Sequence, residues 1–128
     1  MDIKSIAENI NILGSFWGKR DINELNHGEL KSKYNINKAD IMVLFGGSII
    51  AGGDVMAKAI ENEMAEKYII DGGAGHTTET LRKRVNSEYP DILTMGISEA
   101  QVFEKYLDTV YGYKVDFLET KSTNCGNN

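Results

Sequence analysis

The sequence has 128 residues, of which 41% are hydrophobic and 26% charged, and its formal net charge is −5. This length and composition are typical of one globular domain and exclude general disorder. No apolar run approaches the roughly 18 residues of a membrane-spanning helix, and no signal-peptide pattern opens the chain. The acidic charge disfavours nucleic-acid binding, and the lone Cys125 excludes an internal disulfide and a cysteine-based zinc site. We therefore predict a small cytoplasmic domain without nucleic-acid or membrane partners.

Residues 1–35 are predicted to form a helical segment ahead of the main domain. The first apolar residues recur at spacings of three and four, as on one face of a helix: Ile3, Ile6, Ile10 and Leu13. Gly14 and Gly18 weaken this pattern, so the first helix is predicted to end near Trp17. Asp21 followed by Glu24 has the spacing of a capping box and predicts a second helix that begins there.

From residue 36 to residue 128, short apolar runs alternate with glycine-rich turns and helical stretches. Strands are predicted at 41–45, 68–70 and 115–118, with a short extra strand at 92–95. Helices are predicted at about 54–67, 77–89 and 98–112, the last opening with a capping box from Ser98 to Gln101. This order predicts an α/β, Rossmann-like open sheet of parallel strands flanked by helices. The uninterrupted run 41–45 indicates a strand buried on both faces.

Glycine-rich loops follow the predicted strands, at 46–48 and 72–76, and a polar tail follows the third strand. Because parallel strands end at the same edge of a sheet, these loops are expected to lie together, where open α/β sheets bind ligands. Glycines there let a ligand approach the backbone and suit a phosphate, a carboxylate or a ribose. The alternative is that they only make tight turns, but two such loops on one edge favour a binding site.

Three side chains near these loops are candidates for chemistry. Asp71 ends the second strand, where an acid either binds ribose hydroxyls or caps the turn. His76 follows the second loop and is either a general base, a phosphate partner or an ordinary surface residue. Glu99 lies in the first turn of a helix, where the helix dipole favours a carboxylate. No transition-metal site is predicted, although Mg²⁺ held by Asp54 or Glu99 with a phosphate stays open.

Four segments in this order resemble the YdcF-like family, a bacterial family of unknown function that also includes SanA and ElyC: 40–48 (DIMVLFGGS), 68–76 (YIIDGGAGH), 98–100 (SEA) and 122–126 (STNCG). The resemblance covers roughly residues 36–128. It implies a Rossmann-like fold and the binding of S-adenosylmethionine or a related adenosine nucleotide. The motif positions carried over to this chain are Gly46, Gly47, Asp54, Gly72, Gly73, Gly75, His76, Glu99, Ser122 and Asn124.

The last motif departs from the family pattern, because Asn127 stands where the family has a glutamate. The C-terminal half of the family's domain is also expected to be absent. A third strand without that half would leave apolar sheet surface and a strand edge uncovered. We therefore predict either a longer parent protein or a homodimer in which a second copy covers the sheet.

Three hypotheses for function follow, and they leave open whether the chain is an enzyme. In the first, it binds a nucleotide-like small molecule, and the cofactor-binding residues are Gly46, Gly47, Ser48, Asp54, Asp71, Gly72, Gly73, Gly75, His76, Ser122 and Asn124. In the second, it is a hydrolase or methyltransferase with His76 and Glu99 as acid and base. In the third, it is a non-catalytic interaction or assembly protein whose glycine loops are structural.

Overall fold

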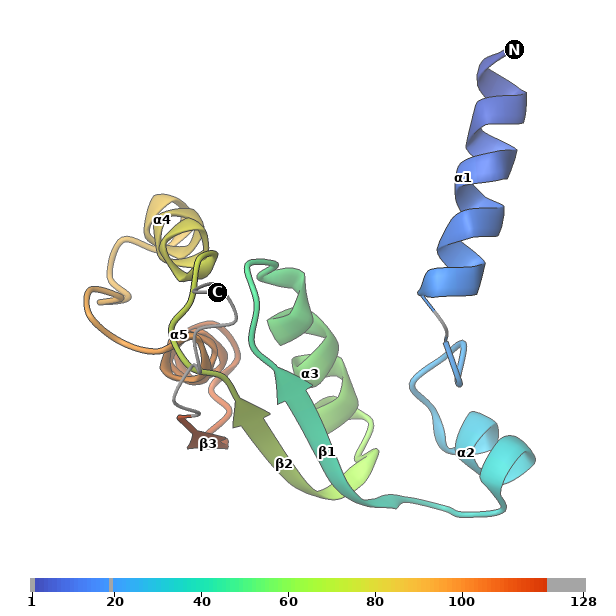
Figure 1. The fold of residues 1–128 in the computed structure, drawn as a ribbon. Helices are drawn as coiled ribbons and strands as arrows, with labels where there is room; N and C mark the ends of the chain where they lie inside the picture. Colours follow the sequence, from blue (N-terminus) through green and yellow to red (C-terminus); the bar gives the residue numbers. More distant parts are fainter. Residues whose placement is uncertain (1, 19, 120–128) are drawn as a thin grey trace, which may run out of the picture.

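The structure is a computed structural model that describes residues 2–18 and 20–119. Its elements are α1 (Ile3–Trp17), α2 (His27–Tyr34), β1 (Ala39–Phe45), α3 (Ala51–Glu61), β2 (Ala65–Asp71), α4 (Thr78–Glu88), α5 (Glu99–Tyr106), the π-helix η1 (Leu107–Tyr111) and β3 (Asp116–Leu118). Figure 1 shows the strands side by side, with α1 standing apart from them. The predicted α/β fold, a parallel open sheet flanked by helices and preceded by two helices, is confirmed.

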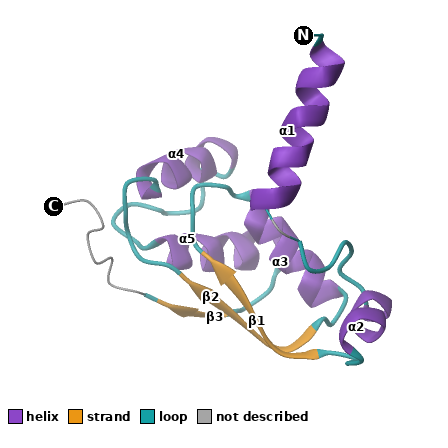
Figure 2. Cartoon of the chain, turned by 45° about the vertical axis from the view of Figure 1, so that its right-hand side comes forward, coloured by secondary structure: helices purple, strands orange, loops and turns teal. Residues whose placement is uncertain are grey.

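The sheet has the strand order β1-β2-β3, and both pairs of neighbouring strands are parallel. Phe45 pairs with Asp71, which in turn pairs with Leu118, so the three strands end at the same edge. Each strand is added on the same side of the one before it. Since crossovers between parallel strands are right-handed, this order places the connecting helices on one face of the sheet. Figure 2 shows α3, α4 and α5 on that one face.

The hydrophobic core lies between this covered face and the helices. Its largest fully buried apolar side chains are Phe103, Met56, Ile70, Leu81, Leu107, Val85 and Val102. Met42 and Leu44 of β1 pack against it from the sheet. A smaller cluster of Leu30, Ala59 and Met64 joins α2 to the body.

The other side of the sheet, which we call the open face, carries Ile41, Val43 and Phe45 of β1, Ile69 of β2 and Leu118 of β3. Side chains alternate along a strand, so these residues point away from the helices. Ile41 is 52% exposed, Val43 40% and Phe45 73%. The prediction that the strand at 41–45 is buried on both faces is therefore wrong, because the described helices lie on one face only.

Helix α2 begins later than the sequence suggests. The predicted capping box at Asp21 is wrong, since the Asn26 side chain accepts a hydrogen bond from the Glu29 backbone N–H at 2.8 Å and starts the helix there. His27 then places one ring nitrogen 2.7 Å from the Asn37 carbonyl oxygen and the other 2.8 Å from that of Asn62. These contacts hold α2 against the body.

Two further boundaries differ from the prediction, and one is confirmed. Helix α3 ends at Glu61 rather than near Lys67, because Glu63 adopts a left-handed backbone conformation (φ 51°) that a helix cannot continue through. Residues 92–95 belong to an irregular loop and not to a strand. The capping box between Ser98 and Gln101 is present at the start of α5. None of the described helices is both long and apolar enough to cross a membrane.

Candidate functional site

The first two strands are each followed by a glycine, and these two glycines lie close together. The Gly46 N–H donates to the Asp71 carbonyl oxygen at 2.7 Å, and the Gly72 N–H donates to that of Leu118 at 3.1 Å. A Cβ atom added to Gly46 would lie 3.2 Å from the Gly72 Cα, and one added to Gly72 would lie 3.1 Å from the Gly46 Cα. These two positions need glycine because the backbones leave no room for a side chain.

The carboxylate of Glu99 lies directly against these glycines. Glu99 is the first residue of α5 and is 9% exposed. One of its oxygens accepts hydrogen bonds from the hydroxyls of Thr78 at 2.8 Å and Thr77 at 3.4 Å. The other would lie 2.9 Å from a Cβ atom added to Gly46. A buried, hydrogen-bonded carboxylate thus underlies the point where the two strand ends meet.

The loop after β2 is tied to the same carboxylate. The Glu99 N–H donates to the Gly73 carbonyl oxygen at 2.9 Å. The Thr78 hydroxyl, which donates to Glu99, also accepts a hydrogen bond from the Gly75 N–H at 2.7 Å. The loop from Gly72 to Thr78 is therefore held in place through its backbone at two points.

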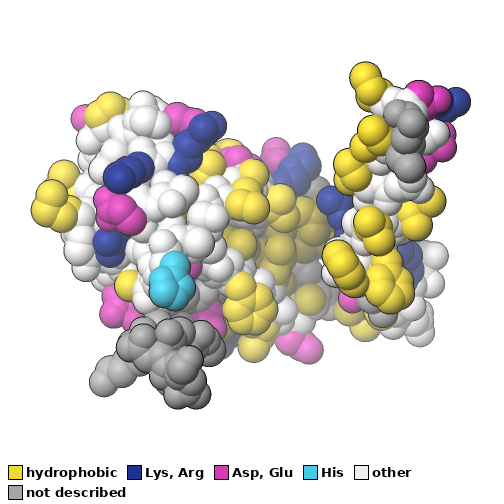
Figure 3. Space-filling model, turned by 45° about the horizontal axis from the view of Figure 1, so that its top comes forward, with side chains coloured by type: hydrophobic (Ala, Val, Ile, Leu, Met, Phe, Trp, Pro, Cys, Tyr) yellow, Lys and Arg dark blue, Asp and Glu magenta, His cyan; other side chains and the backbone are white. Residues whose placement is uncertain are grey.

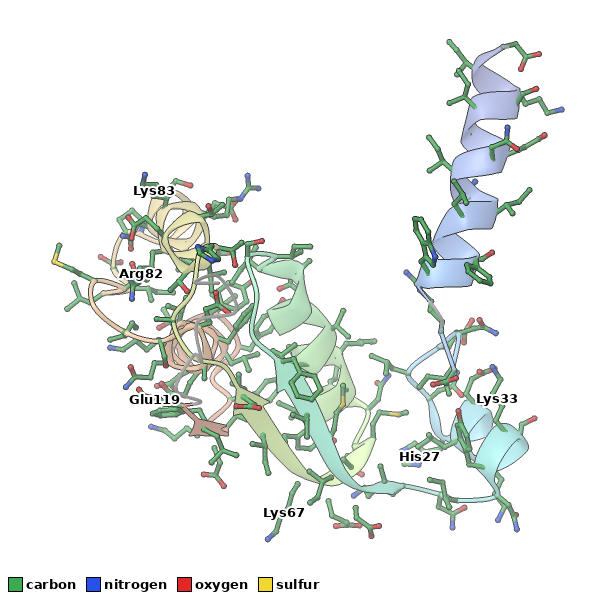
Figure 4. The ribbon with its side chains drawn as sticks, viewed as in Figure 1. His27, Lys33, Lys67, Arg82, Lys83 and Glu119 are labelled. Atoms are coloured by element: carbon green, nitrogen blue, oxygen red, sulfur yellow. The ribbon has the colours of Figure 1, made fainter. Side chains whose placement is uncertain are left out.

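A pocket of about 540 Å³ opens beside the first glycine loop. It is lined by Phe45, Gly46, Gly47, Ser48, Ile49, Gly52, Thr77 and Phe103. These residues supply apolar surface, backbone and two hydroxyls, and none of them carries a positive charge. Arg82 and Lys83 lie on α4 (Figure 4), and the Arg82 guanidinium donates to the Ile97 carbonyl oxygen and to Glu79 instead.

Asp71 lies on the open face beside Phe45, its partner across the strand pair. Its Oδ1 atom is buried and has no hydrogen-bond partner among the described residues. A buried carboxylate oxygen is costly without a donor. Asp71 does not line the pocket beside the first glycine loop, so the structure does not bring it to the same place as Gly47 and Ser48.

Asp54 is engaged elsewhere, on the side of α3 that faces η1. Its Oδ1 atom accepts hydrogen bonds from the hydroxyls of Tyr106 and Tyr111, both at 2.6 Å. Burial and the hydrogen bond to Asp54 raise the pKa of Tyr106, and the hydrogen bond to Asp54 raises the pKa of Tyr111. Asp54 lines a second pocket of about 270 Å³ with both Tyr111 and Tyr113. The structure therefore does not bring Asp54 to the pocket beside the glycine loops.

The remaining sequence-predicted residues fall into three groups. Gly47 and Ser48 line the pocket, while Gly73 and Gly75 belong to the loop tied to Glu99. His76 is exposed, and no hydrogen bond among the described residues joins it to Glu99. Ser122 and Asn124 lie outside the described residues.

Sequence reasoning missed four contributors to these arrangements. Neither Thr78 nor Phe103 was among the candidate site residues. The two tyrosines were not expected to act together, because Tyr106 and Tyr111 are five residues apart and would point in different directions on an α-helix. The π-helix η1, in which the Gly112 N–H reaches the Leu107 carbonyl, brings both onto Asp54.

Comparison with known proteins gives no match. The chain matches no family model, no curated protein and no solved structure.

Proposed function

We propose that this chain binds a small neutral or cationic molecule with hydroxyl or amino groups, in the pocket beside Gly46 and Gly47. Our candidate is S-adenosylmethionine or a related adenosine compound, in line with the resemblance to the YdcF-like family. The observation that carries the proposal is the buried Glu99 carboxylate, which lies against Gly46 and Thr77 of a pocket that has no cationic residue in its described lining.

The charge of the site separates this ligand class from polyphosphates. At an effective dielectric constant of about 20, two like charges about 4 Å apart repel each other by about 4 kcal/mol. A phosphate near an ionised Glu99 would meet that repulsion without a lysine or arginine in the described lining to offset it. A ribose hydroxyl or a sulfonium would instead be attracted to the carboxylate.

The experiment is a calorimetric titration with S-adenosylmethionine, adenosine, NAD and ATP. We expect binding of S-adenosylmethionine and adenosine, and weaker binding of ATP. At a ligand concentration of 100 times Kd, binding stabilises a protein by about 2.7 kcal/mol, which a thermal shift also detects. Absence of binding by every compound, or a preference for ATP, would contradict the proposal.

Two glycine variants localise the site. A side chain added to Gly47 meets nothing within 4 Å, and this residue lines the pocket, so Gly47→Leu should fill the pocket and abolish binding without unfolding the chain. Gly75 also has open space but does not line the pocket, which makes Gly75→Leu the matched control. Binding that survives Gly47→Leu would show that the ligand binds elsewhere, and equal loss in both variants would show that the effect is not specific to this pocket.

Catalysis is the second candidate function, with His76 and Glu99 as acid and base of a hydrolase or methyltransferase. What favours it is the burial of Glu99 next to the pocket. If it holds, His76→Ala should abolish turnover while leaving ligand affinity unchanged. If His76 is an ordinary surface residue, turnover survives the substitution.

We also propose that the domain is cytoplasmic and that it acts as a homodimer. The open face supports the homodimer. Parallel sheets are normally covered on both faces. A second copy would supply the cover that the described residues do not. Ligand binding and dimerisation are separate claims, since Glu99 packs on the covered side and only Phe45 of the five open-face residues lines the ligand pocket.

A further inference from the structure

We propose that α1 of a second copy covers the open face of the sheet, in a two-fold symmetric pair in which each copy receives the other's helix. This proposal rests on the homodimer proposed above and names the segment that forms it. It joins two apolar surfaces that the described residues of a single chain leave exposed.

The first surface is α1. None of its fifteen described residues is buried, although seven are large and apolar: Ile3, Ile6, Ile10, Ile12, Leu13, Phe16 and Trp17. The aromatic pair at its end, Phe16 and Trp17, is 79% exposed at each position. Figure 3 shows hydrophobic side chains along this helix, apart from the body. An isolated helix of about 15 residues is only marginally stable in water, so α1 needs a surface to pack on.

The breadth of the apolar stripe indicates what kind of surface α1 fits. Five of these residues follow the 3-4 spacing of a heptad repeat: Ile3, Ile6, Ile10, Leu13 and Trp17. At about 100° per residue, these five and Phe16 together cover roughly 140° of the helix circumference. A two-stranded coiled coil uses a narrower seam. A stripe this wide is typical of a helix that lies across a flat apolar layer, such as a sheet.

The second surface is the open face and the apolar groove beside it. The groove has a volume of about 290 Å³. It is lined by Ile41 and Val43, which also belong to the open face. Ile22 and Leu25 form its other side. A large aromatic side chain such as Trp17 is the kind of anchor that fills such a groove in protein interfaces.

The two surfaces agree in size. Fifteen helical residues span about 22 Å, and the seven residues of β1 span about 23 Å. Phe16 and Trp17 alone would remove roughly 300 Å² per helix from water. Reciprocal docking doubles every contact, which brings the total within reach of the roughly 1,200–2,000 Å² of a stable interface.

The charges of α1 favour a protein surface over a membrane. Helices that lie on membranes carry lysines and arginines along their polar side. Between Asp2 and Trp17 the only such residue is Lys4, and it is accompanied by Asp2 and Glu8. On the open face, Lys67 extends from β2 away from the helices (Figure 4), with Asp71 and Asp116 farther along the same side. Neither surface has the basic character that lipid headgroups require.

The test is a charge-complementation experiment on the full chain, read by light scattering and native mass spectrometry. We expect the unmodified chain to be a dimer, and Ile10→Asp on α1 and Ile41→Lys on the open face each to give monomers. A mixture of the two variants should form one-to-one dimers, because one contact then pairs the new aspartate with the new lysine while the other is unchanged. Asn11→Asp, one residue from Ile10 on the polar side of α1, is the matched control and should stay dimeric.

Every other outcome overturns the proposal in a recognisable way. A monomeric unmodified chain removes the dimer altogether. A dimer that survives Ile41→Lys pairs through its helices, and one that survives Ile10→Asp does not use α1. Circular dichroism checks that each variant is folded, and Ile10 and Ile41 do not line the ligand pocket, so a failed dimer and a failed ligand site are distinguishable.

Trp17 provides an independent readout because it is the only tryptophan in the chain. We expect its fluorescence to shift to shorter wavelength as the protein concentration rises and α1 is buried in the dimer. A short-wavelength emission that does not depend on concentration, in a monomeric sample, would mean that α1 folds onto its own sheet. Binding of the monomer to anionic vesicles with the same spectral shift would identify a membrane instead.

Discussion

Both faces of the sheet carry large apolar side chains, yet these have opposite surroundings. On the covered face, Ile70 is fully buried and packs with Phe103, which is 1% exposed. On the open face, Phe45 is 73% exposed although it belongs to the same kind of strand. The cause is the topology of the sheet. Each strand is added on the same side of the one before it, and right-handed crossovers then place all the connecting helices on one face. An apolar run therefore reports that a strand belongs to a sheet, but not how many of its faces this chain covers.

The largest expected effect is a loss in the free energy of unfolding when phenylalanine is replaced by alanine. The loss should differ between the covered face and the open face. Phe103→Ala should destabilise the chain by about 3–5 kcal/mol, because it leaves a cavity in the core. Phe45→Ala should change the stability of the monomer by less than about 0.5 kcal/mol. Urea unfolding at low protein concentration measures both. Similar losses for the two variants would mean that the open face is already covered in the monomer.

A second pair of substitutions sharpens the comparison at the strand end, where two adjacent glycines have different neighbours. In Gly46→Ala the new Cβ would meet Glu99 at 2.9–3.0 Å, and we expect a loss of roughly 1–3 kcal/mol. In Gly47→Ala the Cβ meets nothing within 4 Å, so stability should hardly change. Denaturation of both variants tests this. A tolerated Gly46→Ala would show that Glu99 is free to move.

A third and smaller effect concerns the polar contact on the covered side, between Asp54 and the tyrosines. Tyr106→Phe should cost about 1.5 kcal/mol, because a buried hydroxyl that donates to a carboxylate is lost. Tyr111→Phe should cost less, since this side chain is 41% exposed and water can replace it. Equal costs would show that the two hydroxyls are equally shielded.

The smallest effect is a pH dependence with a definite sign. The pKa of Tyr106 and the pKa of Tyr111 are both raised in the folded chain, so the unfolded chain loses these protons first as pH rises. Their contribution to stability is fully present below the ordinary tyrosine pKa of about 10 and is lost as pH rises through the folded values. Ultraviolet titration of tyrosinate should show two late-titrating groups, which disappear in the double phenylalanine variant.

Much of the fold could be predicted because its signals are local. The apolar run before Gly46 and the capping box at Ser98 each lie within a few residues, and both elements form as expected. The start of α2 was missed because Asn26 and Asp21 offer equivalent caps, and the choice depends on Leu30 packing against Ala59 and Met64. That contact is distant in sequence.

The meeting of the two glycine loops could be predicted from the sequence, but the charged groups beside them could not. Both loops lie at the same edge of the sheet, because parallel strands end together. Nothing local indicated that Glu99 would lie buried against Gly46, or that Asp54 would turn toward Tyr106 and Tyr111. Both depend on how α5 is seated against the sheet. Of the phosphate, the carboxylate and the ribose that the glycine loops left open, the buried Glu99 carboxylate favours the ribose.

The π-helix η1 also sets where the last strand begins. A π turn holds one residue more than the α turn it replaces, and each residue of an α-helix adds about 100° of rotation. Deleting the exposed Thr109 would restore an α turn and rotate everything that follows, which would carry Tyr111 away from Asp54. The deletion would also shorten the segment before β3 by one residue. Gly112 would then lie closer to the helix, and Asp116 would lose its pairing with Ile69. The extra residue of the π turn thus reaches beyond the tyrosine contact, since Thr109 lies nine positions before Leu118, the last residue of the third strand.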